Sequence, residues 1–353
     1  MSRSFKIGLF VFVAVMLTTF SFYFWQVAKS PNLQVDKGKS FALLIPTGGT
    51  YEGVLDSLQK NDVLRDEMSF RFLAKLLKLP ERVKAGRYVI KENANNLEVI
   101  QKLRTGNQDA VRLSFNNIRL KSDLIERVGK KFEFGPEGLA QLMNDPVFCQ
   151  KYNTDTINIV SIFLPNTYDI YWNTKAEKFL DRMYDEYQKF WTPARKEKAK
   201  SLGMSQKEVS IMASIVDAET NYAPEMPRIA GVYYNRIKQS MPLQADPTVI
   251  FAHRDFSIKR VNNLLSSLNS PYNTYRMLGL PPGPINIPSI EALEAVLNTE
   301  PHDYLYFCAT VDDDGKITGR HAFAKNYTEH LLNAKMYQQA LNRMNIRANA
   351  SSQ

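Results

Sequence analysis

One glutamate in this sequence, Glu219, has the position that acid catalysis requires. Ser205 and Glu208 form an S-x-x-E capping box, so the sequence predicts a helix over 205–220. At about 100° per residue, Glu219 falls near the middle of the apolar arc of that helix. The polar arc is expected to hold Lys207, Ser210, Ser214 and Asp217. A carboxyl group is therefore expected among apolar neighbours.

These surroundings favour the protonated form of Glu219. Apolar neighbours disfavour a carboxylate charge, and the last turn of a helix is the negative end of its dipole, so both raise the pKa of the side chain. A glutamate that keeps its proton near neutral pH can protonate a leaving-group oxygen. The alternative is a glutamate neutralised by a buried arginine, for which Arg228 and Arg236 are available. The helix alone leaves both interpretations open.

Other catalytic patterns are weak. Gly38-Lys39-Ser40 imitates the end of a phosphate-binding loop, but Leu33 stands where that loop needs a glycine. The sequence has no G-x-S-x-G motif, and its histidines lack metal-ligand spacing. No metal and no cofactor is therefore expected, and His321 is interpreted as structural or substrate-facing. The other histidines are His253, His302 and His330.

Three segments after Glu219 combine amides, tyrosines and prolines. They are YYNRI (233–237), LQADPTVIF (243–251) and SPYNTYRMLGLPPGPINIP (270–288). Aromatic faces bind sugar rings, amides and carboxylates match hydroxyl groups, and prolines stiffen loops. The residues expected in a glycan groove, as sugar contacts or as supports for Glu219, are Asn235, Gln244, Asp246, Tyr272, Asn273 and Tyr275. Asp246 could equally form a turn before Pro247, and Arg236 could be a helix-surface residue.

The N-terminal segment departs most from an ordinary globular composition. No charged residue occurs from Ile7 to Trp25, and at about 1.5 Å per residue this run just crosses a hydrocarbon core of ~30 Å. The run exceeds the h-region of a signal peptide, and no small-x-small site follows before Lys29, which favours a retained anchor over 7–27. The aromatic residues at its end suit the membrane interface. We expect a single-pass protein with residues 1–6 inside and the rest outside.

Composition excludes several other classes. Hydrophobic residues make up 44% and charged residues 23%, which is ordinary for a folded protein and argues against disorder. The net charge of +9 comes without a dense Lys/Arg run, so a basic surface is expected and no nucleic-acid partner. Cys149 and Cys308 are too few for a disulfide framework, and whether they pair stays open.

The positioning elements point to an α+β fold. Periodicity and turn residues predict strands over 41–45 and 86–90, and helices over 51–58, 69–77 and 96–104. Farther on they predict a strand over 111–115, a helix over 176–190, a hairpin of strands 304–311 and 317–323 with a Gly315 turn, and a helix over 326–342. The expected divisions are a linker (28–40), a β-α-α-β module (41–106), a connecting α+β region (107–200), a larger mixed α+β catalytic domain (201–345) and a flexible tail (346–353).

Several motifs together resemble the MltG (YceG-like) family of endolytic murein transglycosylases. They are ASIVDAET (213–220), YYNRI, LQADPTVIF, SPYNTYRMLGLPPGPI and YLYFCATVDDDGKITGRHAF, and the resemblance runs from the anchor to about His330. The chain departs from the family pattern E-G-x-x-x-P-D-T-Y, because it has Val160, Ser161 and Asn166 there. Asp217 and Ala218 also replace the commoner Glu-Lys before Glu219.

The resemblance implies that Glu219 is the catalytic acid and base and that 41–106 is a LysM-like module. It also implies a protein anchored in the bacterial cytoplasmic membrane, with its catalytic domain on the extracytoplasmic side. Its substrate would be the bond between N-acetylmuramic acid and N-acetylglucosamine in nascent peptidoglycan, cut to give 1,6-anhydromuramyl ends. Such cutting limits glycan strand length beside the peptidoglycan synthases.

Two alternatives stay open. Ordinary glycosidases use two carboxylates, so a hydrolytic muramidase with Asp246 as second carboxylate is one of them. The other is a non-catalytic, membrane-tethered scaffold that binds the wall. Mass analysis of the products distinguishes the enzymes, because an anhydro end lacks one water.

Overall fold

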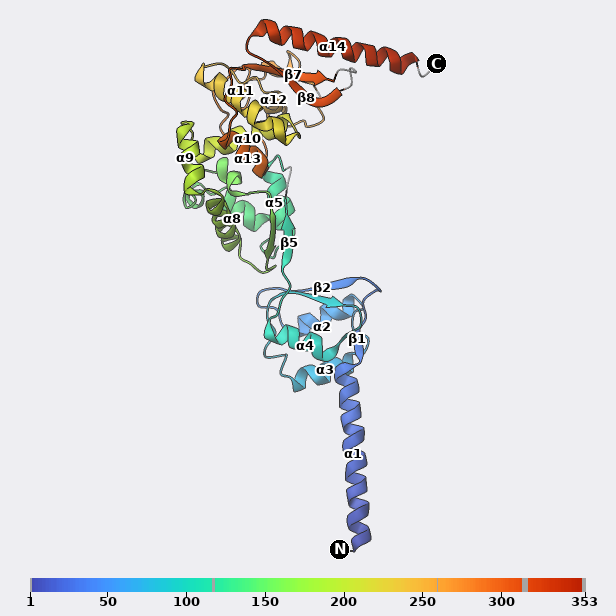
Figure 1. Cartoon of the computed structure of the whole chain (residues 1–353). Coiled ribbons are helices and arrows are strands. Elements are labelled where there is room, and N and C mark those ends of the chain that lie inside the picture. The colour runs from blue at the N-terminus through green and yellow to red at the C-terminus, as the bar shows by residue number, and fades with distance from the viewer. Residues whose placement is uncertain (1, 116–117, 259, 313–316, 351–353) are drawn as a thin grey trace. The chain divides into compact units, whose positions relative to one another are not determined.

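The computed structural model describes residues 2–115, 118–258, 260–312 and 317–350, and the chain divides into two compact units (Figure 1). Both contain helices and paired strands, so the expected mixed α+β class is confirmed. Unit 1 comprises Met1–Leu113, Gly129–Gly135 and Tyr168–Lys175. Unit 2 comprises Ser114–Val128, Pro136–Thr167 and Ala176–Gln353.

Unit 1 contains the predicted β-α-α-β order. Its elements are α1 (Arg3–Lys29), β1 (Pro31–Leu33), β2 (Ser40–Ile45), α2 (Tyr51–Lys60), α3 (Glu67–Leu76), β3 (Gly86–Lys91), β4 (Ala94–Asn95) and α4 (Asn96–Thr105). β2 pairs antiparallel with β3, from Ser40 opposite Lys91 to Ile45 opposite Gly86. Buried Leu58, Phe70 and Tyr88 lie in the core beneath them. The likeness to a LysM module remains a prediction.

α1 is a single helix whose ends have different surroundings. It is long and apolar enough to cross a membrane, and its apolar window is exposed throughout. At its C-terminal end, however, Val27 is 6% exposed and Ala28 3% exposed, in the core of unit 1. The segment 28–40, expected as a linker, contains β1, which pairs with β4. The helix therefore runs from the apolar segment directly into a folded core.

The connecting region contains short helices and a two-stranded sheet of β5 and β6. α8 begins and ends where the sequence predicts, and its Phe179, Met183 and Tyr187 are buried at helical spacing. The elements are β5 (Val111–Ser114), α5 (Lys121–Gly129), α6 (Gly135–Met143), α7 (Pro146–Gln150), η1 (Asn158–Ile162), β6 (Thr167–Ile170), α8 (Ala176–Phe190) and α9 (Pro193–Ser201).

The rest of unit 2 packs helices against a hairpin. The elements are α10 (Gln206–Glu219), η2 (Ala223–Glu225), α11 (Met226–Lys238), α12 (Asp246–His253), η3 (Leu265–Ser267), α13 (Ile290–Leu297), β7 (Tyr306–Val311), β8 (Ile317–Ala324) and α14 (Tyr327–Ala350). The predicted hairpin is confirmed, with Tyr306 opposite Ala324, while the Gly315 turn lies outside the described residues. α14 extends past the predicted end at 342, because neither proline nor glycine interrupts residues 343–350.

Candidate active site

α10 ends at Glu219 and is buried on more sides than its sequence pattern indicated. The predicted capping box is present, since Ser205 N donates to Glu208 Oε2 (2.8 Å) and Glu208 N to Ser205 Oγ (3.2 Å). The predicted polar arc is wrong for Ser210 and Ser214, which are 2% and 0% exposed. Neighbouring segments cover this face, and Ser214 Oγ accepts from Ile285 N (3.0 Å).

Asp217 also differs from the prediction of a solvated residue. It is half-buried, and its Oδ1 accepts hydrogen bonds from the hydroxyl and the N–H (3.2 Å) of Ser289. Burial raises the pKa of this carboxyl. Ser289 caps α13, so Asp217 joins α10 to the start of that helix.

Glu219 is half-buried at the C-terminal end of α10. Its Oε1 accepts a hydrogen bond from the hydroxyl of Tyr233 on α11 (2.6 Å). Burial raises its pKa to about 7, the Asp246 charge adds to that rise, and the hydrogen bond from Tyr233 opposes it. Near neutral pH, Glu219 is therefore protonated in a large fraction of the molecules.

The arginine alternative is wrong for both candidates. Arg236 is 7% exposed, so it is not a helix-surface residue, and its guanidinium donates to the carbonyls of Leu305 (2.6 Å) and Leu243 (2.8 Å). Arg228 pairs instead with Glu300 (3.0 Å). Within the described residues no ion pair includes Glu219. Arg236 lowers the pKa of Glu219 only as its smallest influence.

Glu219 opens into a cleft of about 360 Å³ in unit 2. Helices α10, α11, α12 and α14 and the hairpin contribute its walls. The lining residues are Glu219, Tyr233, Arg236, Leu243, Gln244, Asp246, Tyr275, Tyr306, Phe307, Cys308, Ala309, His321, Tyr327 and His330. Aromatic rings beside carboxyl, amide and guanidinium groups form the kind of surface that binds sugars.

Three of the predicted groove residues, Gln244, Asp246 and Tyr275, line this cleft together with Glu219. The Tyr275 hydroxyl donates to Asp246 Oδ1 (2.5 Å). Burial raises the pKa of Asp246, while this hydrogen bond lowers it. Gln244 has φ of 50°, and its Oε1 accepts from Arg236 (3.2 Å). A second carboxyl group and an amide thus share the space in front of Glu219.

The other three predicted residues do not line the cleft. Asn235 Nδ2 donates to the carbonyls of His302 (2.8 Å) and Tyr304 (3.1 Å). Asn273 is fully buried, and its side chain holds the backbone of its own loop, including the Tyr275 N–H (3.1 Å). Tyr272 packs on Phe251, with ring centroids 4.8 Å apart. These positions suit supports of the cleft rather than sugar contacts.

Among the cleft residues, Tyr233 was not nominated from the sequence, and His321 was interpreted there only as structural or substrate-facing. Tyr233 lies in the YYNRI motif, and its spacing from Ile229 and Arg236 places all three on the buried face of α11, a signal that could have singled it out. His321 Nδ1 lies 3.0 Å from Glu225 Oε2, and both side chains are nearly buried. No sequence signal pairs His321 with Glu225, because they lie 96 residues apart.

Features outside the cleft are weaker candidates for a catalytic site. A second hollow of about 540 Å³, near Tyr152, Ser161 and Tyr184, has no Asp or Glu among its described lining residues. In the described parts of the chain, no three His, Cys, Asp or Glu side chains gather closely enough to hold a metal ion. Cys149 and Cys308 are both free thiols.

Comparisons with known proteins agree with one another. A family model described as the YceG-like family matches residues 43–336. A protein of Bacillus subtilis named endolytic murein transglycosylase is 27% identical over 317 residues, which cover 84% of this chain and 85% of that protein. A protein of Streptococcus pneumoniae with the same name is 25% identical over 360 residues, which cover 93% of this chain and 64% of that protein. The chain thus spans less than two thirds of the streptococcal relative.

A solved structure resembles the fold. The 2.6 Å crystal structure of a YceG-like protein from Listeria monocytogenes matches with a TM-score of 0.53 and 26% identity, covering 83% of this chain and 98% of that one. The similarity therefore extends over most of both chains.

Proposed function

The chain belongs to the YceG-like family, and from this membership we propose that it is a lytic transglycosylase that cleaves the glycan strands of peptidoglycan. The names of its bacterial relatives support the substrate and the reaction class. The observation that carries the chemistry is Glu219, whose pKa is raised to about 7 at the wall of a cleft of sugar-binding character. Such a group can act first as an acid and then as a base.

The proposed reaction needs one carboxyl group. Glu219 gives its proton to the glycosidic oxygen between N-acetylmuramic acid and N-acetylglucosamine as the bond from that oxygen to muramyl C1 breaks. The 2-acetamido group of the substrate stabilises the cationic centre at C1. The Glu219 carboxylate then takes the proton of the muramyl C6 hydroxyl, whose oxygen bonds to C1. The products are a 1,6-anhydromuramyl end and a free N-acetylglucosamine end, and no water is consumed.

The neighbouring residues have distinct parts in this proposal. Tyr233 donates to Glu219 and stabilises the carboxylate that forms when the proton leaves. Asp246 opposes that charge and keeps the proton on Glu219 before the reaction. Gln244, Tyr275 and the rings of the hairpin are placed to contact the sugars.

α1 gives the proposed enzyme its location. An exposed helix with an apolar run of membrane-spanning length supports anchoring through 7–27. The N-terminus then lies in the cytoplasm, and the part of unit 1 that follows α1 lies with unit 2 on the extracytoplasmic side of the cytoplasmic membrane. There the enzyme would cut nascent strands within their length, next to peptidoglycan synthases, and so limit strand length.

A hydrolytic muramidase is the second candidate. Asp246 lines the same cleft as Glu219 and could activate a water molecule. Its muramyl product would contain one more water than the anhydromuramyl product, while the N-acetylglucosamine end would be the same. A non-catalytic wall-binding scaffold would release no soluble product at all.

The test is the digestion of purified sacculi by the full chain and by Glu219→Gln. The amide cannot donate and then accept the proton, so we expect anhydromuropeptide release to fall at least ~100-fold while the protein stays folded. Asp217→Asn is the matched control, because this carboxyl lies on the same helix outside the lining of the cleft. Release of anhydro ends at the wild-type rate by Glu219→Gln would refute the assignment, and products carrying water would establish the muramidase.

A further inference from the structure

α3 in unit 1 carries an exposed apolar stripe opposite its buried face. Met68, Phe72 and Leu76 recur every four residues, with 81%, 49% and 55% of their surfaces exposed. The face that packs into the core holds Phe70, Leu73 and Ala74. Three large apolar side chains in a row on a solvent-exposed helix face form the kind of patch that marks an interaction surface.

The stripe lies beside the end of α1. The Asn96 amide donates to the carbonyl of Val27 (2.9 Å) and to Ser69 Oγ (3.1 Å), so the first turn of α3 adjoins the last turns of α1. At about 100° per residue, Ser69 lies only ~20° beyond the Leu76 edge of the stripe. The apolar side chains are therefore on the side of α3 that neighbours α1.

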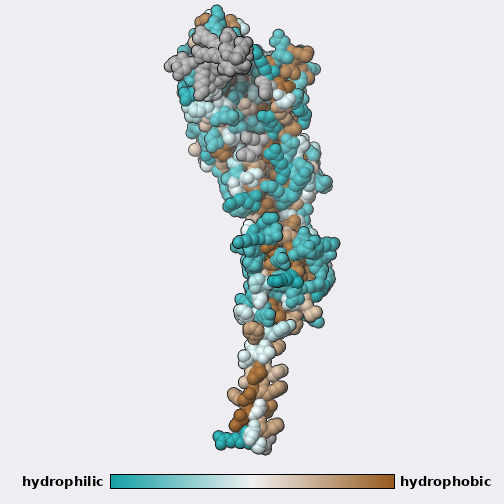
Figure 2. Space-filling model, turned by 90° about the vertical axis from the view of Figure 1, so that its right-hand side faces the viewer, coloured by the Kyte–Doolittle hydropathy of each residue, from teal (hydrophilic) through white to brown (hydrophobic). Residues whose placement is uncertain are grey.

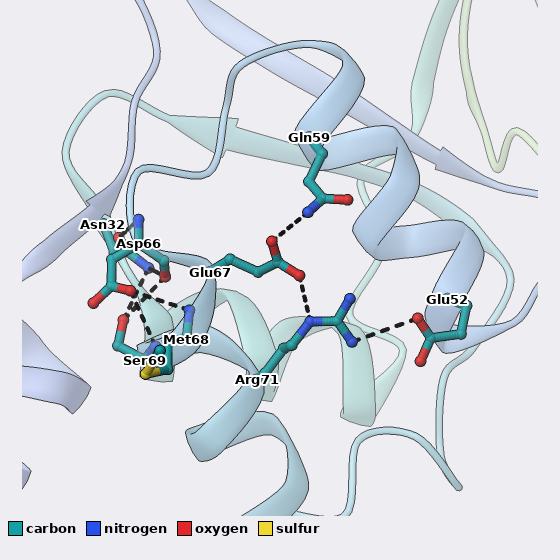
Figure 3. A network of polar contacts seen from close by, with 8 residues as sticks. All are labelled: Asn32, Glu52, Gln59, Asp66, Glu67, Met68, Ser69 and Arg71. Carbon is teal, nitrogen blue, oxygen red and sulfur yellow. Dashed lines mark hydrogen bonds and ion pairs between the residues drawn. The ribbon is translucent and has the colours of Figure 1, made fainter.

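Polar contacts fix α3 in this place (Figure 3). Asn32, which directly follows the residues joining α1 to unit 1, donates to the Asp66 carbonyl (2.8 Å) and accepts from its N–H (2.7 Å). Glu67 bonds to Gln59 of α2 and to Arg71 within α3. These contacts connect α3 to the segment that follows α1 and to α2.

The contact between α1 and the first turn of α3 lies at the C-terminal end of the apolar segment of α1. Val27 follows Trp25 by two residues, and Trp25 closes the charge-free segment at the expected interface. Figure 2 shows apolar atoms along the stem formed by α1 and weakly polar to apolar atoms where the stem meets unit 1. Exposed Lys75, Lys78 and Arg82 follow on the same stretch of chain.

We propose that α3 is a second, peripheral membrane contact. This inference rests on the proposed anchoring by α1. The apolar stripe enters the membrane interface on the side where the C-terminal end of α1 emerges. Lys75 lies ~20° beyond the Met68 edge of the stripe and contacts anionic phospholipid headgroups. An apolar face flanked by basic residues is the composition of a helix that lies in the plane of the interface.

The test measures membrane depth in the full chain, reconstituted in nanodiscs that contain phosphatidylglycerol. A nitroxide is attached to a single cysteine in a Cys149→Ala, Cys308→Ala background, at Phe72→Cys on α3, at Val15→Cys in α1 and at Gln59→Cys on α2. Power saturation compares exposure of the label to oxygen and to a water-soluble nickel chelate. We expect the label at 72 to lie about 5–10 Å below the headgroups, the label at 15 to lie deeper, and the label at 59 to lie in water.

Each outcome decides the inference. Adding Met68→Gln and Leu76→Gln is expected to move the label at 72 into water, because both apolar neighbours are lost and neither belongs to the core. A label at 72 in water while the label at 15 is shielded overturns the α3 contact and leaves the anchor intact. A label at 15 in water overturns both.

Discussion

At the scale of single residues, Tyr233 and Asp246 act on Glu219 in opposite directions. The Tyr233 hydroxyl stabilises the ionised carboxylate and lowers its pKa, whereas the Asp246 charge raises it. In the proposed mechanism Glu219 must hold its proton to cleave the bond, so activity is expected to decline as pH rises through about 7. The midpoint of that decline reports the pKa of Glu219.

Tyr233→Phe is expected to move the midpoint to higher pH. The variant removes a hydrogen bond worth about 1 kcal/mol to the carboxylate, which corresponds to ~0.7 pH units. The measurement is kcat/KM for anhydromuropeptide release across neutral pH. A midpoint that stays in place, or moves to lower pH, contradicts the role given to this hydroxyl.

Asp246→Asn is expected to move the same midpoint to lower pH, since the negative charge that holds the proton on Glu219 is gone. At acidic pH the variant should retain activity. A large loss of activity at every pH, with the midpoint of the residual activity unchanged, would instead favour Asp246 as a second carboxylate of a hydrolase.

The sequence allowed Glu219 to be chosen but not its partners. Its apolar neighbours lie within one helix, where a constant angle per residue predicts which side chains share a face. Tyr233 reaches it only because α10 and α11 pack together, a contact that no local pattern encodes. The same limit explains Ser210 and Ser214, whose polar types suggest solvent although other segments cover them.

At the scale of elements, the cleft depends on a loop held against the start of α12. Thr274 is buried at 1% exposure, and its Oγ1 accepts from Ala245 N (3.0 Å) and lies 2.8 Å from Thr248 Oγ1. These contacts fix Tyr275 next to Asp246, although the two come from different segments.

Thr274→Val keeps the volume of the side chain and removes both contacts. It leaves a buried N–H without its acceptor, so the free energy of unfolding should fall by about 1–3 kcal/mol. Chemical denaturation measures the loss. Thr328→Val, on the exposed face of α14, is the control and is expected to change stability by less than ~0.5 kcal/mol. Equal stability of both variants would show that the loop is held by other contacts.

Elements with local signals were predicted well. α8 and the start of α10 follow from helical spacing and a cap, and the hairpin follows from its turn residues. β1 and β4 were missed because strands of three and two residues are too short to show alternation. They form only because distant segments meet.

At the scale of the whole molecule, the two units interleave in sequence. Gly129–Gly135 belongs to unit 1 although it lies far along the chain, and the carboxylate of Glu133 accepts from Thr47 Oγ1 (2.8 Å). Composition revealed the apolar run of α1 directly. It could not reveal that the same helix ends inside a core, because that depends on contacts with α3 and α4.

The buried end of α1 predicts where a soluble fragment can begin. A fragment that starts at residue 30 lacks Val27 and Ala28, so unit 1 should lose about 2 kcal/mol relative to a fragment that starts at residue 26. Thermal unfolding of both fragments, followed by a probe in unit 1, checks the difference. Identical unfolding would show that the two side chains do not contribute to that core.

α1 continues into the rest of unit 1 without a flexible joint. The Val27 carbonyl is held by Asn96, and the helix continues through Ala28 without a hinge. If α1 spans the bilayer as proposed, its rotation about its long axis must therefore turn the rest of unit 1 by the same angle. A partner that binds one side of α1 within the proposed membrane anchor would thereby also set the direction in which the rest of unit 1 points.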